Sequence, residues 1–130
     1  MPKFDPYAVG STSVATATAN KRQTLASSGA GIVNSLELLT EGMPRLYFWI
    51  AQTVGAVGLT VQPQFMVRAS PAPGAGDEWL PLIPPVVLVP GSVPTIIEQA
   101  FPATKIRLQF TGVALQASTV ELVLGCSSAT

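Results

Sequence analysis

Histidine is missing from this sequence, and cysteine occurs once, at Cys126. Without histidine the chain cannot build a Ser-His-Asp or Cys-His nucleophile system, and it lacks the commonest side-chain ligand for metals. A single cysteine allows neither an internal disulfide nor a cysteine-based metal site within one chain. The adjacent acids Asp77 and Glu78 fall in a Gly- and Pro-rich loop, where acidic side chains are usually just solvated. We therefore expect no enzyme, no metal and no cofactor, and we interpret Cys126 as a small apolar residue near the end of a strand.

Charge is also scarce. Charged residues make up 11% of the chain, against about 25% in a typical soluble domain. Seven basic residues balance seven acidic ones and no basic cluster stands out, so we expect no nucleic-acid partner. So few charges cannot cover a domain surface, and large exposed apolar patches usually mark interfaces. We expect copies of the chain or a larger partner to cover this surface; the alternative is a monomer with a Ser-, Thr- and Ala-rich exterior.

Long helical patterns are absent as well. The uncharged stretch Trp79 to Ile97, WLPLIPPVVLVPGSVPTII, is long enough to cross a bilayer, but five of its residues are prolines. Each interior proline costs a helix about 3 kcal/mol, so we expect no membrane span here. The prolines instead indicate two short strands, 86–89 and 95–98, joined by a corner. A sharper hypothesis is a proline-rich apolar rim that docks on a neighbouring subunit. The first ten residues lack the apolar core of a secretory signal, so none is expected.

The first 31 residues differ from the rest in bulk. The run GSTSVATATANKRQTLASSGAG contains only Val14 and Leu25 as large aliphatic residues. Within it, residues 12–19 alternate Thr, Ser or Val with Ala, as an edge strand or an arm lying on another surface would. Because such a composition tends toward disorder in isolation, we divide the chain into an extended N-terminal arm, 1–31, and a single domain, 32–130.

Strand patterns occupy the remainder. Segments 35–40 and 45–52 flank a Gly-Pro turn and predict a hairpin; a short helix capped by Asn34 is the alternative. Pro63 interrupts a strand over 59–68, which indicates an edge strand or a bulge.

The last third alternates most clearly. In residues 105–110 and 119–124 every second residue is apolar, which is typical of half-buried strands. Glu121 points outward in this pattern and could pair across strands with Arg107 or Lys105. With turn signals about every ten residues and no long helix, the sequence predicts an all-β protein, an antiparallel β-sandwich with the jelly roll as a candidate topology.

Aromatic residues raise an alternative function. Tyr47 and Trp49 share one face of a predicted strand and could form a sugar-stacking platform, with Trp79 as a further candidate. Phe48 and Ile50 occupy the opposite face of the same strand. We therefore favour a buried strand over a platform.

The ending FPATKIRLQFTGVALQASTVELVLGCSSA, together with the small-residue arm, resembles small structural proteins of tailed bacteriophage virions, of the head decoration (cement) type. The likeness spans about residues 86–130 and rests on strand pattern and composition, so no functional residues are carried over. It implies subunits that cluster, often as trimers, on a shell of major capsid protein, with a terminus that reaches a neighbour.

The sequence thus favours a virion structural protein, most simply a capsid decoration or stabilising protein located on the capsid surface. It would form homo-oligomers, trimers above all, and bind the major capsid protein or another virion protein. The alternative is a carbohydrate-binding or adhesin-like module of a fibre or extracellular appendage. The residues that we expect at the assembly interface are large or rigid apolar residues of the arm and of the proline-rich stretch: Val14, Leu25, Trp79, Pro84, Pro85 and Pro90.

Overall fold

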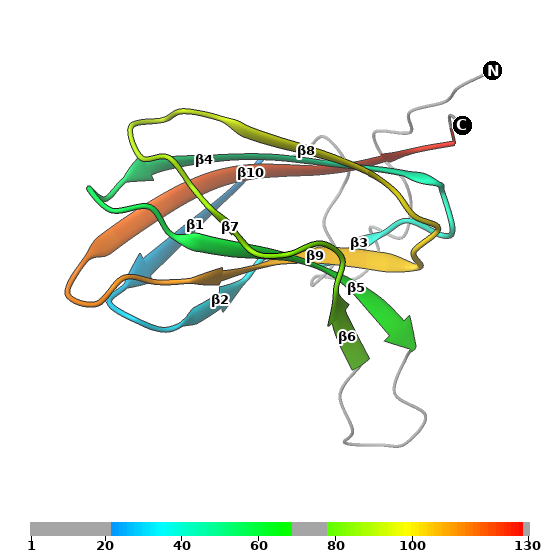
Figure 1. The fold of residues 1–130 in the computed structure, drawn as a ribbon, viewed down its shortest axis with the longest axis horizontal. Helices are drawn as coiled ribbons and strands as arrows, with labels where there is room; N and C mark the ends of the chain where they lie inside the picture. The colour runs from blue at the N-terminus through cyan, green and yellow to red at the C-terminus, as the bar shows by residue number, and fades with distance from the viewer. Residues whose placement is uncertain (1–21, 69–77, 129–130) are drawn as a thin grey trace.

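The computed structural model describes residues 22–68 and 78–128, which form two stacked antiparallel β-sheets without a helix (Figure 1). The first sheet has the strand order β1 (Gln23–Ser28), β10 (Ala117–Ser127), β4 (Arg45–Val54) and β8 (Thr95–Ala100). The second has the order β2 (Ile32–Asn34), β9 (Lys105–Thr111), β5 (Thr60–Arg68) and β6 (Glu78–Pro81). The short strands β3 (Leu38–Leu39) and β7 (Val86–Val87) add to β9 and β5. The predicted all-β antiparallel sandwich is confirmed.

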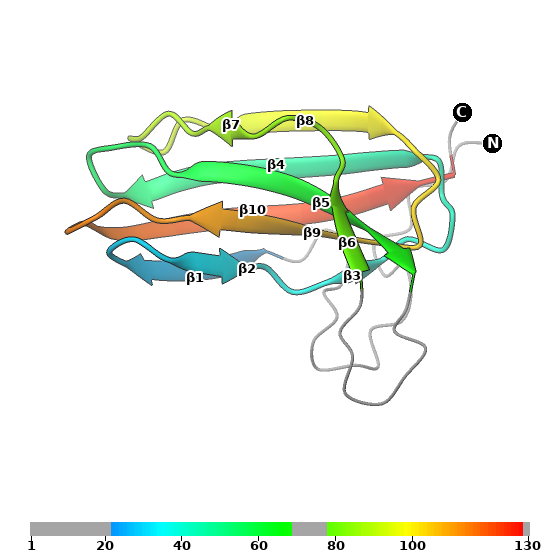
Figure 2. The same cartoon turned by 60° about the horizontal axis from the view of Figure 1, so that its bottom comes forward.

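The strand pairs are nested like one long hairpin that has been rolled up. The outermost strands of the chain, β1 and β10, pair with each other. Inside them β2 and β3 pair with β9, then β4 with β8, and finally β5 with β6 and β7. Successive strand pairs lie in alternate sheets, so that the four sets of paired strands make two layers (Figure 2). This is the arrangement of a jelly roll.

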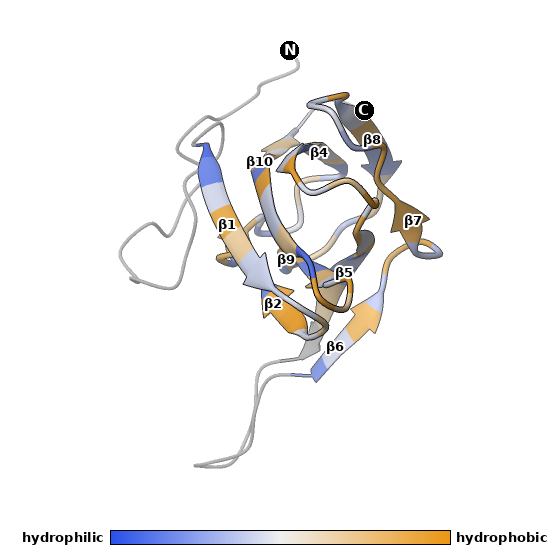
Figure 3. Cartoon of the chain, turned by 90° about the vertical axis from the view of Figure 1, so that its left-hand side faces the viewer, coloured by the Kyte–Doolittle hydropathy of each residue, from blue (hydrophilic) through white to orange (hydrophobic). Residues whose placement is uncertain are grey.

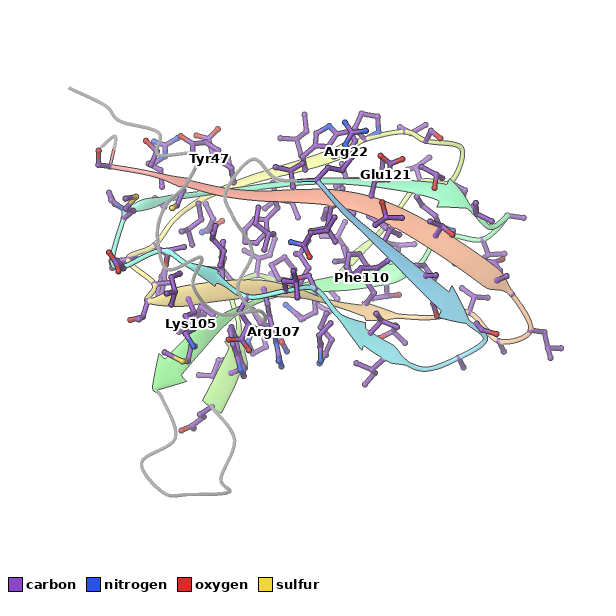
Figure 4. All side chains as sticks on the ribbon, turned by 180° about the vertical axis from the view of Figure 1, so that it is seen from behind. Arg22, Tyr47, Lys105, Arg107, Phe110 and Glu121 are labelled. Carbon is purple, nitrogen blue, oxygen red and sulfur yellow. The ribbon has the colours of Figure 1, made fainter. Side chains whose placement is uncertain are left out.

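The core lies between the layers. Alternate residues of β4, β9 and β10 point inward and are fully buried, as the period of two predicts. Phe110 extends into the space between the sheets, whereas Lys105 and Arg107 of the same strand lie on the outer face (Figure 4). The central cluster comprises Leu46, Phe48, Ile50, Val61, Ile106, Leu108, Phe110, Leu122 and Leu124. Cys126 is buried with them, as expected for a small apolar residue.

The predicted hairpin between 35–40 and 45–52 is wrong, and so is the alternative helix. Residues 38–39 form β3 in the second sheet, while Arg45 begins β4 in the first. The turn at 41–44 therefore carries the chain from one layer to the other. Glu41 and Gly42 both adopt positive φ there, and the amide of Gly42 donates to Ala103 O (2.9 Å), which anchors the corner.

Pro63 lies in an interior strand rather than at an edge. It stands opposite Leu108 of β9, but the backbone of Leu108 bonds to Ser35 on its other side. The missing N–H of Pro63 therefore points away from β9, toward the gap between β6 and β7. The carbonyl oxygen of Pro63 accepts from Leu82 N (2.9 Å) in that gap. The strand tolerates proline because no ladder bond is lost.

The boundary between arm and sandwich lies earlier than the sequence indicated. Residues 23–28, assigned to the arm, form β1 and pair along their whole length with β10. The Gln23 side chain accepts the amide of Leu36 (3.0 Å) and ties β1 to the second sheet. The sandwich therefore includes Gln23, and the rest of the predicted arm, residues 1–21, lies outside the described residues.

The proline-rich stretch 79–97 is divided among β6, β7, the start of β8 and their connections. None of the described residues belongs to a helix able to cross a membrane.

Candidate interaction surfaces

Four connections meet at one end of the sandwich, on the left in Figure 1, and we call this the loop end. They are residues 29–31 between β1 and β2, 55–59 between β4 and β5, 88–94 between β7 and β8, and 112–116 between β9 and β10. None of these connections contains a charged residue. Seen end-on in Figure 3, they are coloured pale to orange, the apolar half of the scale. Connections at a protein surface are usually polar, so this end is unusual.

Buried Gln52 holds two of the connections in place. Its side-chain amide donates to Val57 O (2.8 Å) and its carbonyl oxygen accepts from Leu59 N (2.8 Å). The backbone carbonyl of the same residue accepts from Ser92 N (2.9 Å). Gln52 itself is fully buried at the end of β4. One side chain thus replaces the bonds that a regular ladder would supply to the β4–β5 loop.

The side chain of Gln116, in the β9–β10 turn, also bonds to the backbone of the β4–β5 loop. Its side-chain NH2 group donates to Val57 O (2.8 Å), and its side-chain oxygen accepts from Val57 N (3.1 Å). These two bonds join the β9–β10 turn to the β4–β5 loop. The carbonyl of Gln116 accepts from Gly29 N, and Gly31 O accepts from Gly112 N, both at 2.8 Å. The loop end is therefore a preformed surface built on hydrogen bonds.

This rigid end exposes large aliphatic side chains. Leu115, at the tip of the β9–β10 turn, is 104% exposed and has a φ of 61°. A bulky residue with positive φ is strained, and such strain concentrates at functional sites. Its exposed aliphatic neighbours at this end are Val54, Val57, Val89 and Val93.

The outer face of the first sheet carries the aromatic pair. Tyr47 and Trp49 point away from the core, as their alternation with Phe48 and Ile50 predicted, and both are half-buried. The Arg22 guanidinium lies 5.3 Å from the centre of the Trp49 ring and also pairs with Glu121 (2.7 Å). Figure 4 shows Arg22, Tyr47 and Glu121 on this face. The predicted partners of Glu121 were wrong, because Arg107 and Lys105 belong to the opposite sheet.

The outer face of the second sheet is polar. Arg107 stacks on Trp79 of β6, with 4.3 Å between guanidinium and ring centre, and its Nε donates to Gln64 (2.8 Å). Lys105 pairs with Glu37 (3.3 Å). Both tryptophans thus have an arginine over one ring face. That arrangement suits a structural role better than an open platform for sugar stacking.

The residues predicted for an assembly interface do not form one surface. Leu25 of β1 is half-buried and packs against the core. Trp79 lies on the outer face of the second sheet, Pro84 and Pro85 are exposed between β6 and β7, and Pro90 pairs with Gln52 at the loop end. Val14 lies outside the described residues.

Sequence reasoning missed the loop end itself. Two signals pointed to it: the connection VGAVG at 54–58 and the turn TGVALQAS at 111–118 are both apolar and uncharged where a turn is normally polar. The role of Gln116 had no local signal, since its partner Val57 is 59 residues away in the chain.

Comparisons with known proteins show the fold. No family model and no curated protein matches the chain. Similar solved structures include PirA (TM-score 0.55, 15% identity, 79% of this chain and 92% of that one). The Yersinia pseudotuberculosis-derived mitogen is also similar (TM-score 0.53, 13% identity, 83% and 86%). A chain of infectious bursal disease virus, Gt strain, matches with a TM-score of 0.51 and 10% identity, over 84% of this chain and 30% of that one. These similarities include a viral structure, but they do not single out tailed bacteriophages.

Proposed function

We propose that this chain is a non-enzymatic structural protein that works by assembly, and that the loop end is the surface through which it assembles. The single observation that carries the proposal is the loop end: four uncharged connections, held by hydrogen bonds from buried Gln52 and from Gln116, that expose aliphatic side chains to water. Exposed apolar patches mark interfaces, and a preformed surface loses little conformational entropy on binding.

The setting that we propose is a virion, with the protein as a decoration or stabilising protein on the capsid surface. The subunits would form homo-oligomers, trimers in the first instance, and bind the major capsid protein or another virion protein. A jelly roll shared with a chain of a virus structure supports this setting, as does the resemblance of residues 86–130 to phage head proteins. The glycan-binding alternative has less support, because an arginine covers one face of each tryptophan.

The test is the native mass of the full chain, measured by light scattering coupled to size exclusion, with negative-stain images of the same peak. We expect a discrete trimer or larger particle. Leu115→Asn removes the exposed aliphatic side chain and suits positive φ, so this variant should fold normally and lose assembly. Leu80→Thr is the matched control, since Leu80 is an exposed leucine on β6, away from the loop end.

A stable monomer for the unmodified chain would overturn the proposal. If Leu115→Asn and Val57→Asn both assemble normally, the loop end is not the assembly surface.

A further inference from the structure

Strand β8 is an edge whose hydrogen-bonding groups are open. The amide of Phe101 donates to Pro44 O (2.9 Å), directly after the register pair Arg45 and Ala100. In an antiparallel ladder, bonded and non-bonded pairs alternate. Residues 95, 97 and 99 therefore bond to β4, and Ile96, Glu98 and Ala100 turn their N–H and C=O groups outward. Among the described residues no strand pairs with that side of β8.

The edges of the second sheet are interrupted, as natural edges usually are. One edge is split between β6 and β7 around Pro84 and Pro85, and the other is split between β2 and β3 at Ser35. β8 has no such interruption. Its six residues contain neither proline nor lysine, and Ile96 on it is 71% exposed. Such a strand is a template for another strand.

The chemistry of β8 argues against pairing with itself. The antiparallel register that uses all three outward residues of both β8 strands would place Glu98, which pairs with Arg45 of β4, opposite the same residue of the second copy. Like charges directly opposite each other are destabilising. A segment without charge fits better, and residues 12–19, TSVATATA, within the uncharged run 6–20, provide one. Its alternation of Thr, Ser and Val with Ala suits a strand exposed on one face.

The reach of the chain decides which copy supplies that segment. In the first sheet β1 and β8 are the two opposite edges, so a strand added beyond β8 would lie four spacings, about 19 Å, from β1. The four Cα–Cα steps from residue 19 to residue 23 cover at most about 14 Å. Residues 12–19 cannot pair with β8 of their own chain.

We propose that residues 12–19 of one copy add as a strand to the open edge of β8 in a second copy. This inference deepens the proposed assembly function and rests on it: the strand contact joins copies alongside the loop-end contact, and stable association needs both. The fold-back alternative, in which the segment pairs with β1 of its own chain, needs a tight turn at Asn20 and Lys21. Such turns favour glycine at the second position, and lysine stands there.

The test uses two full-length proline variants on the two open edges. Glu98→Pro blocks β8 without breaking its ladder to β4, because the N–H of Glu98 faces outward. Ala26→Pro does the same on β1, where the bond from Gly29 N to Gln116 O places the N–H of Ala26 outward too. We expect Glu98→Pro to abolish association and Ala26→Pro to leave it unchanged. Glu98→Gln, which removes the charge and its ion pair with Arg45 but keeps the strand free of proline, should associate at least as well as the unmodified chain.

A complementation experiment sharpens the result. A chain lacking residues 2–20 keeps β8 but has no strand to give, whereas Glu98→Pro has the strand but no edge to receive one. Each should be a monomer alone, and their mixture should form a one-to-one pair in light scattering. A mixture that stays monomeric, or normal association of Glu98→Pro, would overturn the inference. Loss of association in Ala26→Pro alone would assign the segment to β1.

The two proposals can fail separately. If the unmodified chain is a monomer, assembly itself is refuted. If Leu115→Asn abolishes assembly while Glu98→Pro does not, only the strand exchange is refuted.

Discussion

At the loop end, single glutamine side chains make hydrogen bonds to backbone groups that have no partner in a neighbouring strand. Replacing Gln52 by Ala would leave the buried Leu59 N–H without its partner, whereas Val57 C=O keeps the bond from Gln116. An unsatisfied buried group costs about 1–3 kcal/mol, so we expect the free energy of unfolding to fall by about 1–3 kcal/mol. Urea denaturation measures this. Gln109→Ala, on the outer face of β9, should cost less than about 0.5 kcal/mol; equal losses in both variants would refute the special role of Gln52.

Close backbone approach explains a second residue at this end. A Cβ atom on Gly58 would overlap the carbonyl oxygen of Leu88, whereas one on Gly31 would meet nothing within 4 Å. We therefore expect Gly58→Ala to destabilise the fold by about 1–3 kcal/mol, as overpacking does. Gly31→Ala should be neutral or slightly stabilising, because it only restricts the unfolded chain. Thermal melting of the two variants side by side decides the matter, and equal melting temperatures would contradict it.

At the scale of elements, β6 is attached to the second sheet partly by a side chain of another strand. Arg107 of β9 reaches across β5 to stack on Trp79 and bonds Gln64 on the way. We expect Arg107→Ala to lower stability by about 0.5–1 kcal/mol through the lost stacking. It should also shift Trp79 fluorescence to longer wavelength, measured in a Trp49→Phe background. Arg107→Lys should show much of the shift, since lysine lacks the planar group; an unchanged spectrum in both variants would refute the contact.

The elements show where sequence patterns work and where they stop. The alternation in 105–110 and 119–124 correctly identified β9 and β10 and their inward faces, because burial on one face imposes a period of two. The same local information could not say which strands pair. Residues 35–40 and 45–52 are neighbours in sequence but enter different sheets. Glu121 binds Arg22, about a hundred residues away in the chain, for the same reason.

The candidate site was less predictable than the fold. A surface made of four connections exists only after the strands have been nested, so residues such as Val57 and Leu115 share no pattern in sequence. The predicted interface residues were chosen for bulk and rigidity, and the structure distributes those it describes between the core and three separate regions. Only Pro90 falls at the loop end.

For the whole molecule, the position of β1 defines a minimal folding unit. Deletion of residues 2–20 should leave unfolding cooperative, because every described strand remains. Deletion through residue 31 removes β1, the packing of Leu25 and the bond from Leu36 N to Gln23, and opens an edge on β10. We expect that shorter chain to lose cooperative unfolding in circular dichroism. A cooperative transition in the chain beginning at 32 would show that β1 is dispensable.

The nesting of the strands also sets an order in time. β10 is the central partner of both β1 and β4, yet it is made last of the described strands, and it joins residues as distant as Gln23 and Leu122. At about 5–20 residues per second of synthesis, β1 waits roughly 5–20 s for β10, its partner among the described strands. The first sheet therefore closes only after β10 has left the ribosome, and until then the apolar faces of β1 and β4 have no cover from β10.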